Sequence, residues 1–287
     1  TKNSNLLDKL IAFLKIQSIS TDRRFSTSCE EAANWLIEEL SSIGFDTKLH
    51  KTNGHPIVLA KLGAGQPHLL FYGHYDVQPP DPLDLWDTDP FTPIIKDGPK
   101  GKIICARGAS DDKGQLMTFI NACRAIVEIN GVLPCKITIL IEGEEESGSP
   151  SLSPFLKKNK KDLEADYALI CDTGMWNSTT PAISTMLRGM LGEEITIKAA
   201  NKDLHSGMYG GPAINPIREL TKLISTIHDD KGRITIKDFY KNVPETPAKI
   251  KNQWDNLNFS SKKFLNSVGL HTSAGEEPYS VLEQLWS

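Results

Sequence analysis

Phe71-Tyr72-Gly73-His74-Tyr75-Asp76-Val77-Gln78-Pro79 is the stretch around which the rest of the chain can be arranged. The apolar residues at 68–72 predict a buried strand, which ends before the prolines. In extended backbone the histidine at 74 and the carboxylate at 76 lie on one face, roughly 6.5 Å apart along the strand. Such a pair can be a metal-binding imidazole whose second nitrogen is held by the carboxylate. The alternative is a surface histidine followed by an aspartate that caps a turn.

Acidic residues also follow three other predicted strands. The clusters are 108–114 after the strand at 103–105, 142–149 after 136–141, and 172–174 after 167–171. Because the carboxyl ends of strands in an α/β sheet share one edge, we expect these groups to converge there. Two carboxylates 4 Å apart repel by about 4 kcal/mol at an effective dielectric near 20, so a cation is needed. A histidine with aspartate and glutamate ligands suits divalent zinc or manganese.

The composition limits the classes of protein to which the chain can belong. It has 287 residues and a formal net charge of −4 with interspersed signs, so it offers no basic stripe for nucleic acid. No apolar run approaches about 18 residues, and the first residues lack the pattern of an export signal. We therefore expect a soluble, cytoplasmic protein without nucleic-acid or membrane partners, long enough for one large domain or two ordinary ones.

The cysteines are odd in number and contain no Cys-x-x-Cys pair. They are Cys29, Cys105, Cys123, Cys135 and Cys171, and four of them lie in or beside apolar segments. This pattern favours buried, reduced thiols over a disulfide framework.

Periodicity predicts an alternation of helices and strands. Helices are expected at 6–14 with Ser4 as N-cap, 28–43 before Gly44, 112–130, 151–160 and 213–228. Strands at 45–50, 57–62 and 68–72 precede a proline- and aspartate-rich loop at 79–101, and two more strands are expected at 182–186 and 193–198. The sequence pattern changes past Asp172, and we place a domain boundary near 183–188. The fold class is therefore α/β, with domains at 1–185 and 186–287.

Five motifs occur in a fixed order. They are Gly73-His74-Tyr75-Asp76-Val77-Gln78-Pro79, Arg107-Gly108-Ala109-Ser110-Asp111-Asp112-Lys113-Gly114, the glutamate run ending Ser147-Gly148-Ser149, Asp172, and Asp203-Leu204-His205-Ser206-Gly207. With these motifs the chain resembles, over essentially its whole length, the two-metal amidohydrolases. That family includes carnosine-type and non-specific dipeptidases, acetylornithine deacetylase, succinyl-diaminopimelate desuccinylase and glutamate carboxypeptidase. The dipeptidase branch is the most similar, through residues 75–79 and 145–149.

The resemblance implies a fold and a set of metal ligands. The fold is a catalytic domain at 1–185, with a mixed sheet and helices on both faces, and a smaller α+β lid and dimerisation domain at 186–287. The cofactors are two divalent ions, zinc or alternatively manganese. His74 and Asp172 correspond to the terminal ligands of one ion, Asp111 to the bridge between both, and Glu146 to a ligand of the other. Taken without this resemblance, Asp111 could be only a helix cap.

The resemblance also implies the residues that do the chemistry. Asp76 corresponds to the carboxylate behind the metal-binding histidine, and Glu145 to the general base. The run of three glutamates leaves two registers, and Glu145 with Glu146 is selected because the paired acids of the family stand directly before one residue and then a glycine. Asp112 and Glu144 are then expected to be a helix-start residue and a surface charge.

The histidines outside the first motif divide into two groups. His205 corresponds to the lid histidine, which in dimers of the family reaches the active site of the neighbouring subunit and polarises the scissile carbonyl. Its alternative is a hydrogen-bonded loop histidine. The remaining histidines, expected to be structural or exposed, are His50, His55, His68, His228 and His271.

One departure from the family concerns its last metal ligand. The second ion takes a histidine from late in the chain, and no position from Arg218 onward matches it. We therefore expect the sequence to be the N-terminal portion of a longer protein, whose remainder also carries residues that bind the substrate carboxylate.

The expected function is metal-dependent hydrolysis of amide bonds in dipeptides or short peptides, by a homodimer formed through the lid domain. Two alternatives remain open. One is an N-acyl amino acid deacylase, which uses the same centre on a different acyl group. The other is a non-catalytic homologue or an inactive fragment, because the last metal ligand is absent.

Overall fold

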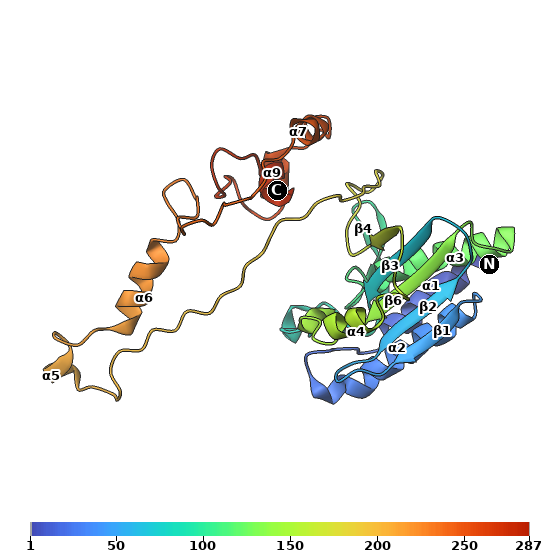
Figure 1. The fold of residues 1–287 in the computed structure, drawn as a ribbon, viewed down its shortest axis with the longest axis horizontal. Helices are drawn as coiled ribbons and strands as arrows, with labels where there is room; N and C mark the ends of the chain where they lie inside the picture. The colour runs from blue at the N-terminus through green and yellow to red at the C-terminus, as the bar shows by residue number, and fades with distance from the viewer. Residues whose placement is uncertain (1, 287) are drawn as a thin grey trace. The chain divides into compact units, whose positions relative to one another are not determined.

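The computed structural model describes residues 2–286, which divide into two units between Ile183 and Ser184 (Figure 1). The catalytic and lid roles that the sequence suggests for the two parts of the chain stay predictions.

A five-stranded mixed sheet forms the centre of the first unit. Its order is β1 (Asp46–His50), β2 (Ile57–Leu62), β6 (Lys136–Glu142), β3 (His68–His74) and β7 (Tyr167–Ile170). β2 is antiparallel to both β1 and β6, whereas β3 is parallel to both β6 and β7. The parallel strands β6, β3 and β7 therefore end at the same edge of the sheet. The predicted α/β class with a mixed sheet is confirmed.

Helices cover both faces of this sheet (Figure 1). α1 (Lys2–Leu14), α2 (Ser26–Ser41) and α3 (Lys113–Asn130) lie against one face, and α4 (Leu152–Lys158) lies against the other. Side chains alternate between the faces, so Ile139 and Ile141 of β6 pack in the larger cluster while Leu140 packs against Phe155 of α4.

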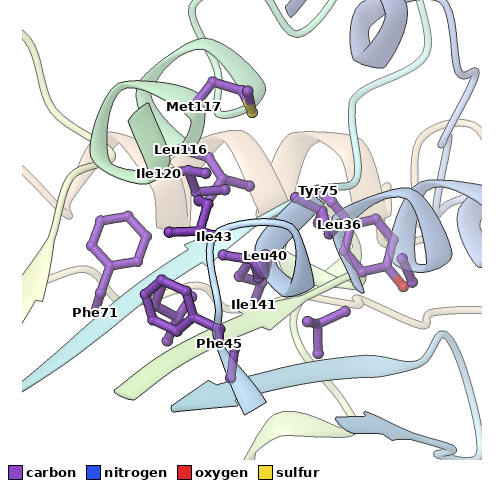
Figure 2. Close-up of a cluster of buried hydrophobic side chains, with 14 of the residues drawn as sticks. Leu36, Leu40, Ile43, Phe45, Phe71, Tyr75, Leu116, Met117, Ile120 and Ile141 are labelled. Atoms are coloured by element: carbon purple, nitrogen blue, oxygen red, sulfur yellow. The ribbon is translucent and has the colours of Figure 1, made fainter. Parts of the chain in front are cut away.

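The larger cluster joins the helices to the sheet. Leu36 and Leu40 come from α2, Leu116 and Ile120 from α3, and Phe71 from β3, and all five are completely buried. Figure 2 shows these side chains converging between the helices and the strands. At roughly 1.5–3 kcal/mol for each fully buried large apolar side chain, the cluster holds α3 firmly against β3.

Several boundaries differ from the sequence predictions. β3 extends to His74, two residues beyond the predicted end, because it pairs with β6 up to Glu142. α1 begins at Lys2, so the predicted N-cap Ser4 lies inside the helix. The predicted loop at 79–101 also contains regular structure.

The segment after residue 79 contains a short helix and a hairpin. η2 spans Leu83–Leu85, and β4 (Ile94–Gly98) pairs with β5 (Gly101–Cys105) in an antiparallel hairpin. The other 3-10 helices of the first unit are η1 (Arg23–Phe25) and η3 (Glu145–Ser147).

The second unit is built from short helices: α5 (Ser206–Tyr209), α6 (Pro216–Ser225), α7 (Ala248–Asp255), α8 (Ser261–Asn266) and α9 (Val281–Trp286). α6 begins three residues later than predicted, because the side chain of Asn215 accepts hydrogen bonds from the backbone of Ile217 and Arg218.

The two strands predicted at 182–186 and 193–198 are wrong, because neither run has strand structure. A strand needs a neighbour for its backbone groups, and no part of the described chain pairs with either run. The side chains of Ile183 and Met190 are 87% and 98% exposed.

All five cysteines are free thiols, but of the expected buried set only Cys29 and Cys123 are buried, whereas Cys105, Cys135 and Cys171 are partly exposed. Among the helices of residues 2–286, none combines the length and the apolar character needed to cross a bilayer.

Candidate metal centre

His74 stands at the end of β3 with a completely buried side chain. Its Nδ1 lies 3.3 Å from Oδ1 of Asp76 and 3.1 Å from the carbonyl oxygen of the same residue. Nε2 is also buried, but it has no hydrogen-bond partner within the described chain. A buried polar atom without a partner is costly unless a ligand binds it. His74 therefore directs one ring nitrogen to Asp76 and leaves the other available for a ligand.

Three carboxylates surround the available nitrogen. Nε2 lies 3.2 Å from Oδ1 of Asp111, 3.6 Å from Oδ2 of Asp172 and 4.0 Å from Oε2 of Glu145. The ligand atoms of His74, Asp111 and Asp172 all lie within 4.8 Å of one another. An imidazole whose one nitrogen contacts a carboxylate and whose other nitrogen faces aspartates is typical of a binding site for a divalent transition metal.

The topology explains why these residues meet. β3 and β7 are parallel neighbours, so His74, the last residue of β3, and Asp172, two residues after β7, lie at the same edge of the sheet. Asp111 directly precedes Asp112, which is the N-cap residue of α3, and α3 packs on β3. Residues distant in sequence thus reach one edge of the sheet.

Asp76 connects this histidine to the glutamate run. Its side chain is completely buried, and its two oxygens accept hydrogen bonds from the backbone N–H groups of Glu145 and Glu146, at 3.2 and 3.0 Å. The same carboxylate therefore orients His74 and fixes the backbone of η3.

The two glutamates point to different partners. The Glu145 carboxylate adjoins Nε2 of His74, whereas Oε2 of Glu146 accepts a hydrogen bond of 2.6 Å from Nε2 of Gln78. Glu146 is not among the three residues whose ligand atoms converge. The structure thus brings together His74, Asp111 and Asp172, with Glu145 beside them.

The electrostatics of the site favour a bound cation. Burial alone lowers the pKa of His74, but the hydrogen bond to Asp76 and the nearby carboxylates outweigh burial and raise this pKa to about 10. Burial raises the pKa of Glu145 and of Glu146, and neighbouring carboxylates add to both shifts. The donor set and the unpartnered Nε2 fit a divalent metal ion, whose charge offsets this repulsion.

The sequence did not indicate that the Asp112 side chain is buried behind His74. It is at the helix start as expected, but its side chain is buried, and Oδ2 accepts a hydrogen bond of 3.0 Å from the backbone N–H of His74. A Cβ atom at Gly73 would lie 2.9 Å from the same oxygen. Burial raises the pKa of Asp112 to about 7. The glycine before His74 was the available signal for this close approach.

Glu144 is not the surface charge that the sequence predicted. Only 5% of the residue is exposed. Its carboxylate accepts hydrogen bonds from the backbone N–H groups of His55, at 3.2 Å, and Ser151, at 3.1 Å. These bonds join the glutamate run to the loop before β2 and to the start of α4, which explains the burial.

Lys113 is a completely buried lysine beside the ligand segment. Its Nζ donates hydrogen bonds to the carbonyl oxygens of Phe13, at 3.1 Å, and Ile16, at 2.7 Å. Burial lowers the pKa of Lys113 to about 7. These bonds attach the start of α3 to the end of α1, and no periodicity in the sequence indicated them.

His205 belongs to the second unit. It occupies the N-cap position of α5 with an exposed side chain, and its side chain makes no capping hydrogen bond. Its suggested role at an active site stays a prediction.

Comparison with known proteins identifies the family. Residues 70–277 match Peptidase family M20/M25/M40. The chain belongs to this family. The resemblance to the dipeptidase branch of the two-metal amidohydrolases is thereby confirmed.

Curated relatives of this M20 chain carry dipeptidase names. Cys-Gly metallodipeptidase DUG1 of Candida albicans is 32% identical over 98% of this chain and 61% of its own length. Beta-Ala-His dipeptidase of Homo sapiens is 33% identical over 80% of this chain and 46% of its own length. The chain thus spans about three-fifths of the length of the DUG1 relative.

Solved M20 structures share the fold. The M20 family metallo-carboxypeptidase Sso-CP2 from Sulfolobus solfataricus is 31% identical, with a TM-score of 0.76 over 97% of this chain and 61% of that one. The dipeptidase Dug1p from Saccharomyces cerevisiae is 27% identical, with a TM-score of 0.74 over 96% of this chain and 60% of that one.

Proposed function

We propose that this chain is the metal-binding part of a dipeptidase that hydrolyses amide bonds in dipeptides or short peptides. The observation that carries the proposal is the convergence of His74, Asp111 and Asp172 within 4.8 Å around an unpartnered ring nitrogen. The dipeptidase names of relatives that match 80% or more of the chain support the substrate class.

The proposed cofactors are two divalent ions, zinc or alternatively manganese. His74, Asp111 and Asp172 would hold one ion, and Asp111 with Glu146 would hold the other. When bound, such ions lower the pKa of water from 15.7 to about 7 and supply a nucleophile at neutral pH.

Glu145 is the proposed general base. Its carboxylate accepts a proton from the attacking water and donates it to the leaving amine nitrogen, a role typically worth about 10²–10⁴-fold in rate. The position of Oε2, 4.0 Å from Nε2 of His74, supports this role. Asp76 positions both groups, because its carboxylate contacts the imidazole of His74 and the backbone of Glu145.

The second unit is the proposed lid and dimerisation domain. In this proposal His205 of one subunit donates a hydrogen bond to the oxyanion formed in the other. One such donor contributes about 2.7–4 kcal/mol to stabilisation of the transition state.

Glu145→Gln in the metal-loaded full-length protein tests the function. We expect kcat for dipeptides to fall at least about 100-fold while metal content is unchanged, because the amide is not a base. Activity within about tenfold of the wild type would show that another group takes the proton.

A substrate panel separates the dipeptidase from its alternatives. Dipeptides and N-acyl amino acids are assayed with the wild-type protein and added zinc or manganese. Hydrolysis of only the acylated amino acids would establish a deacylase. Tight metal binding without hydrolysis of either class would establish a non-catalytic protein.

A further inference from the structure

A cavity in the first unit shares no residue with the candidate metal centre. Its volume is about 600 Å³, and it lies between the end of β1, the loop at 51–54 and α4. Cavities of about 300–1,000 Å³ are typical of small-molecule sites. His50, the last residue of β1, pairs with Ile57 of β2. The next residue of β2, Val58, pairs with Ile141 near the end of β6. The cavity therefore lies at the edge of the sheet where β6 ends.

Three lysines line this cavity, which we name the β1–α4 cavity. Lys48, Lys51 and Lys158 are exposed, and within residues 2–286 none of their side chains forms a hydrogen bond or an ion pair. Glu144 is the carboxylate of the lining, and its oxygens are already occupied by backbone N–H groups. The lining therefore has an excess of two positive charges, and its lysines are available to a ligand.

His50 adds a polar group to the same lining. Its Nε2 is buried and has no hydrogen-bond partner within the described chain. Burial lowers the pKa of His50, and the charges of Lys48 and Lys158 lower it further, so the ring is neutral at pH 7. A neutral imidazole can donate one hydrogen bond, and a ligand oxygen would satisfy the buried atom.

The cavity also has an apolar part. Phe155 is 8% exposed and contacts the ring of His50 edge-on, with centroids 5.0 Å apart and an interplanar angle of 77°. Pro150 and Pro154 continue this surface. A ligand that combines a charged group with an apolar group would match both halves of the lining.

We propose that the β1–α4 cavity binds a small organic dianion, either a phosphate monoester or a dicarboxylate. The lysines bind the charged oxygens, Nε2 of His50 donates a hydrogen bond, and Phe155 contacts the apolar part. Two negative charges on the ligand equal the positive excess of the lining. The site does not depend on the proposed hydrolase activity.

Two probes and two double variants test the site. Phenyl phosphate and succinate are each titrated calorimetrically into the metal-loaded full-length protein. Lys51→Gln/Lys158→Gln removes two lysines of the lining, and Lys157→Gln/Lys160→Gln removes the same charge from nearby positions outside it. We expect the first variant to weaken binding about tenfold for each lysine, whereas the second stays within about twofold of the wild type.

A second readout locates the bound probe. The imidazole resonances of His50 are expected to shift on titration, while those of the exposed His271 stay in place. Binding of phenyl phosphate alone identifies a phosphate site, and binding of succinate alone identifies a dicarboxylate site. Equal weakening by both double variants, binding that survives Lys51→Gln/Lys158→Gln, or no saturable binding of either probe would overturn the proposal.

Discussion

At the scale of single residues, Gly73 lies close to the Asp112 carboxylate behind the candidate metal centre. A Cβ at position 73 would meet Oδ2 of Asp112 at 2.9 Å, and this oxygen accepts the backbone hydrogen bond of His74. Gly73→Ala should therefore displace the carboxylate and break that bond. We expect zinc affinity, measured by competition with a chelator, to fall about 10–100-fold, as is typical when groups that support a ligand are lost.

Gly189→Ala is the control for this prediction. Position 189 has no atom within 4 Å of an added Cβ, so metal affinity should be unchanged. If Gly73→Ala keeps the affinity of the wild type, the hydrogen bond from His74 to Asp112 does not position the ligand.

His68 should make the stability of the first unit depend on pH. The residue is buried, and its Nε2 lies 2.8 Å from Oγ1 of Thr138. Burial lowers the pKa of His68 below its ordinary value of 6.5. As pH falls below 6.5, the unfolded state takes up a proton that the folded state does not, so the free energy of unfolding decreases. Above that pH the contribution is fully present.

Urea unfolding between pH 7.5 and pH 5 measures this effect. We expect the loss of stability on acidification to be smaller in His68→Asn than in the wild type, because asparagine does not titrate. His271→Asn, at an exposed position, should keep the wild-type slope. Equal slopes in all three proteins would mean that His68 titrates alike in both states.

The contacts of individual residues could be predicted from the sequence only where a motif indicates them. The motif around His74 predicted its neighbour Asp76, and the two side chains do meet at 3.3 Å. The burial of Asp112 and Glu144 could not be predicted, because it results from backbone N–H groups that other elements bring to them. Local charge patterns contain no information about such distant donors.

At the scale of elements, the end of α3 depends on a left-handed residue. Gly131 follows the helix with φ 74°, and its N–H donates to the carbonyl oxygen of Val127. Gly131→Ala should lower the free energy of unfolding by about 1 kcal/mol, because a side chain is unfavourable in this conformation. Chemical denaturation measures the change, and Gly174→Ala, where an added Cβ meets nothing within 4 Å, is the control. Equal stability of the two variants would contradict the prediction.

Elements with a clear period and a packing partner could be predicted well. α3 was expected at 112–130 and spans Lys113–Asn130, because its apolar face packs on the sheet. The runs at 182–186 and 193–198 have strand-like composition but no neighbouring strand in the described chain. Composition favours a strand, whereas hydrogen bonding to another strand makes one.

At the scale of the whole molecule, metal binding should stabilise the first unit. The candidate ligands His74, Asp111 and Asp172 meet only in the folded state, so an ion held by them would bind the folded form in preference to the unfolded one. At a free zinc concentration of 100 times Kd, the expected gain is about 2.7 kcal/mol. Thermal unfolding should show a higher Tm with zinc and reversal by a chelator.

His74→Ala is the control for this stabilisation. The variant lacks one of the three candidate ligands, so zinc should change its Tm much less than that of the wild type. An equal increase of Tm in both proteins would place the stabilising ion elsewhere in the molecule.

The parallel pairing of β3 with β7 also has a consequence for synthesis of the protein. Position 172 leaves the ribosome 98 residues after position 74 (172 − 74), since the chain is made from its N-terminus. Until β7 emerges, β3 has an open edge in the nascent chain. If the three converging residues hold an ion as proposed, they can do so only late in biogenesis, and this open edge is where we expect a chaperone to protect the growing polypeptide.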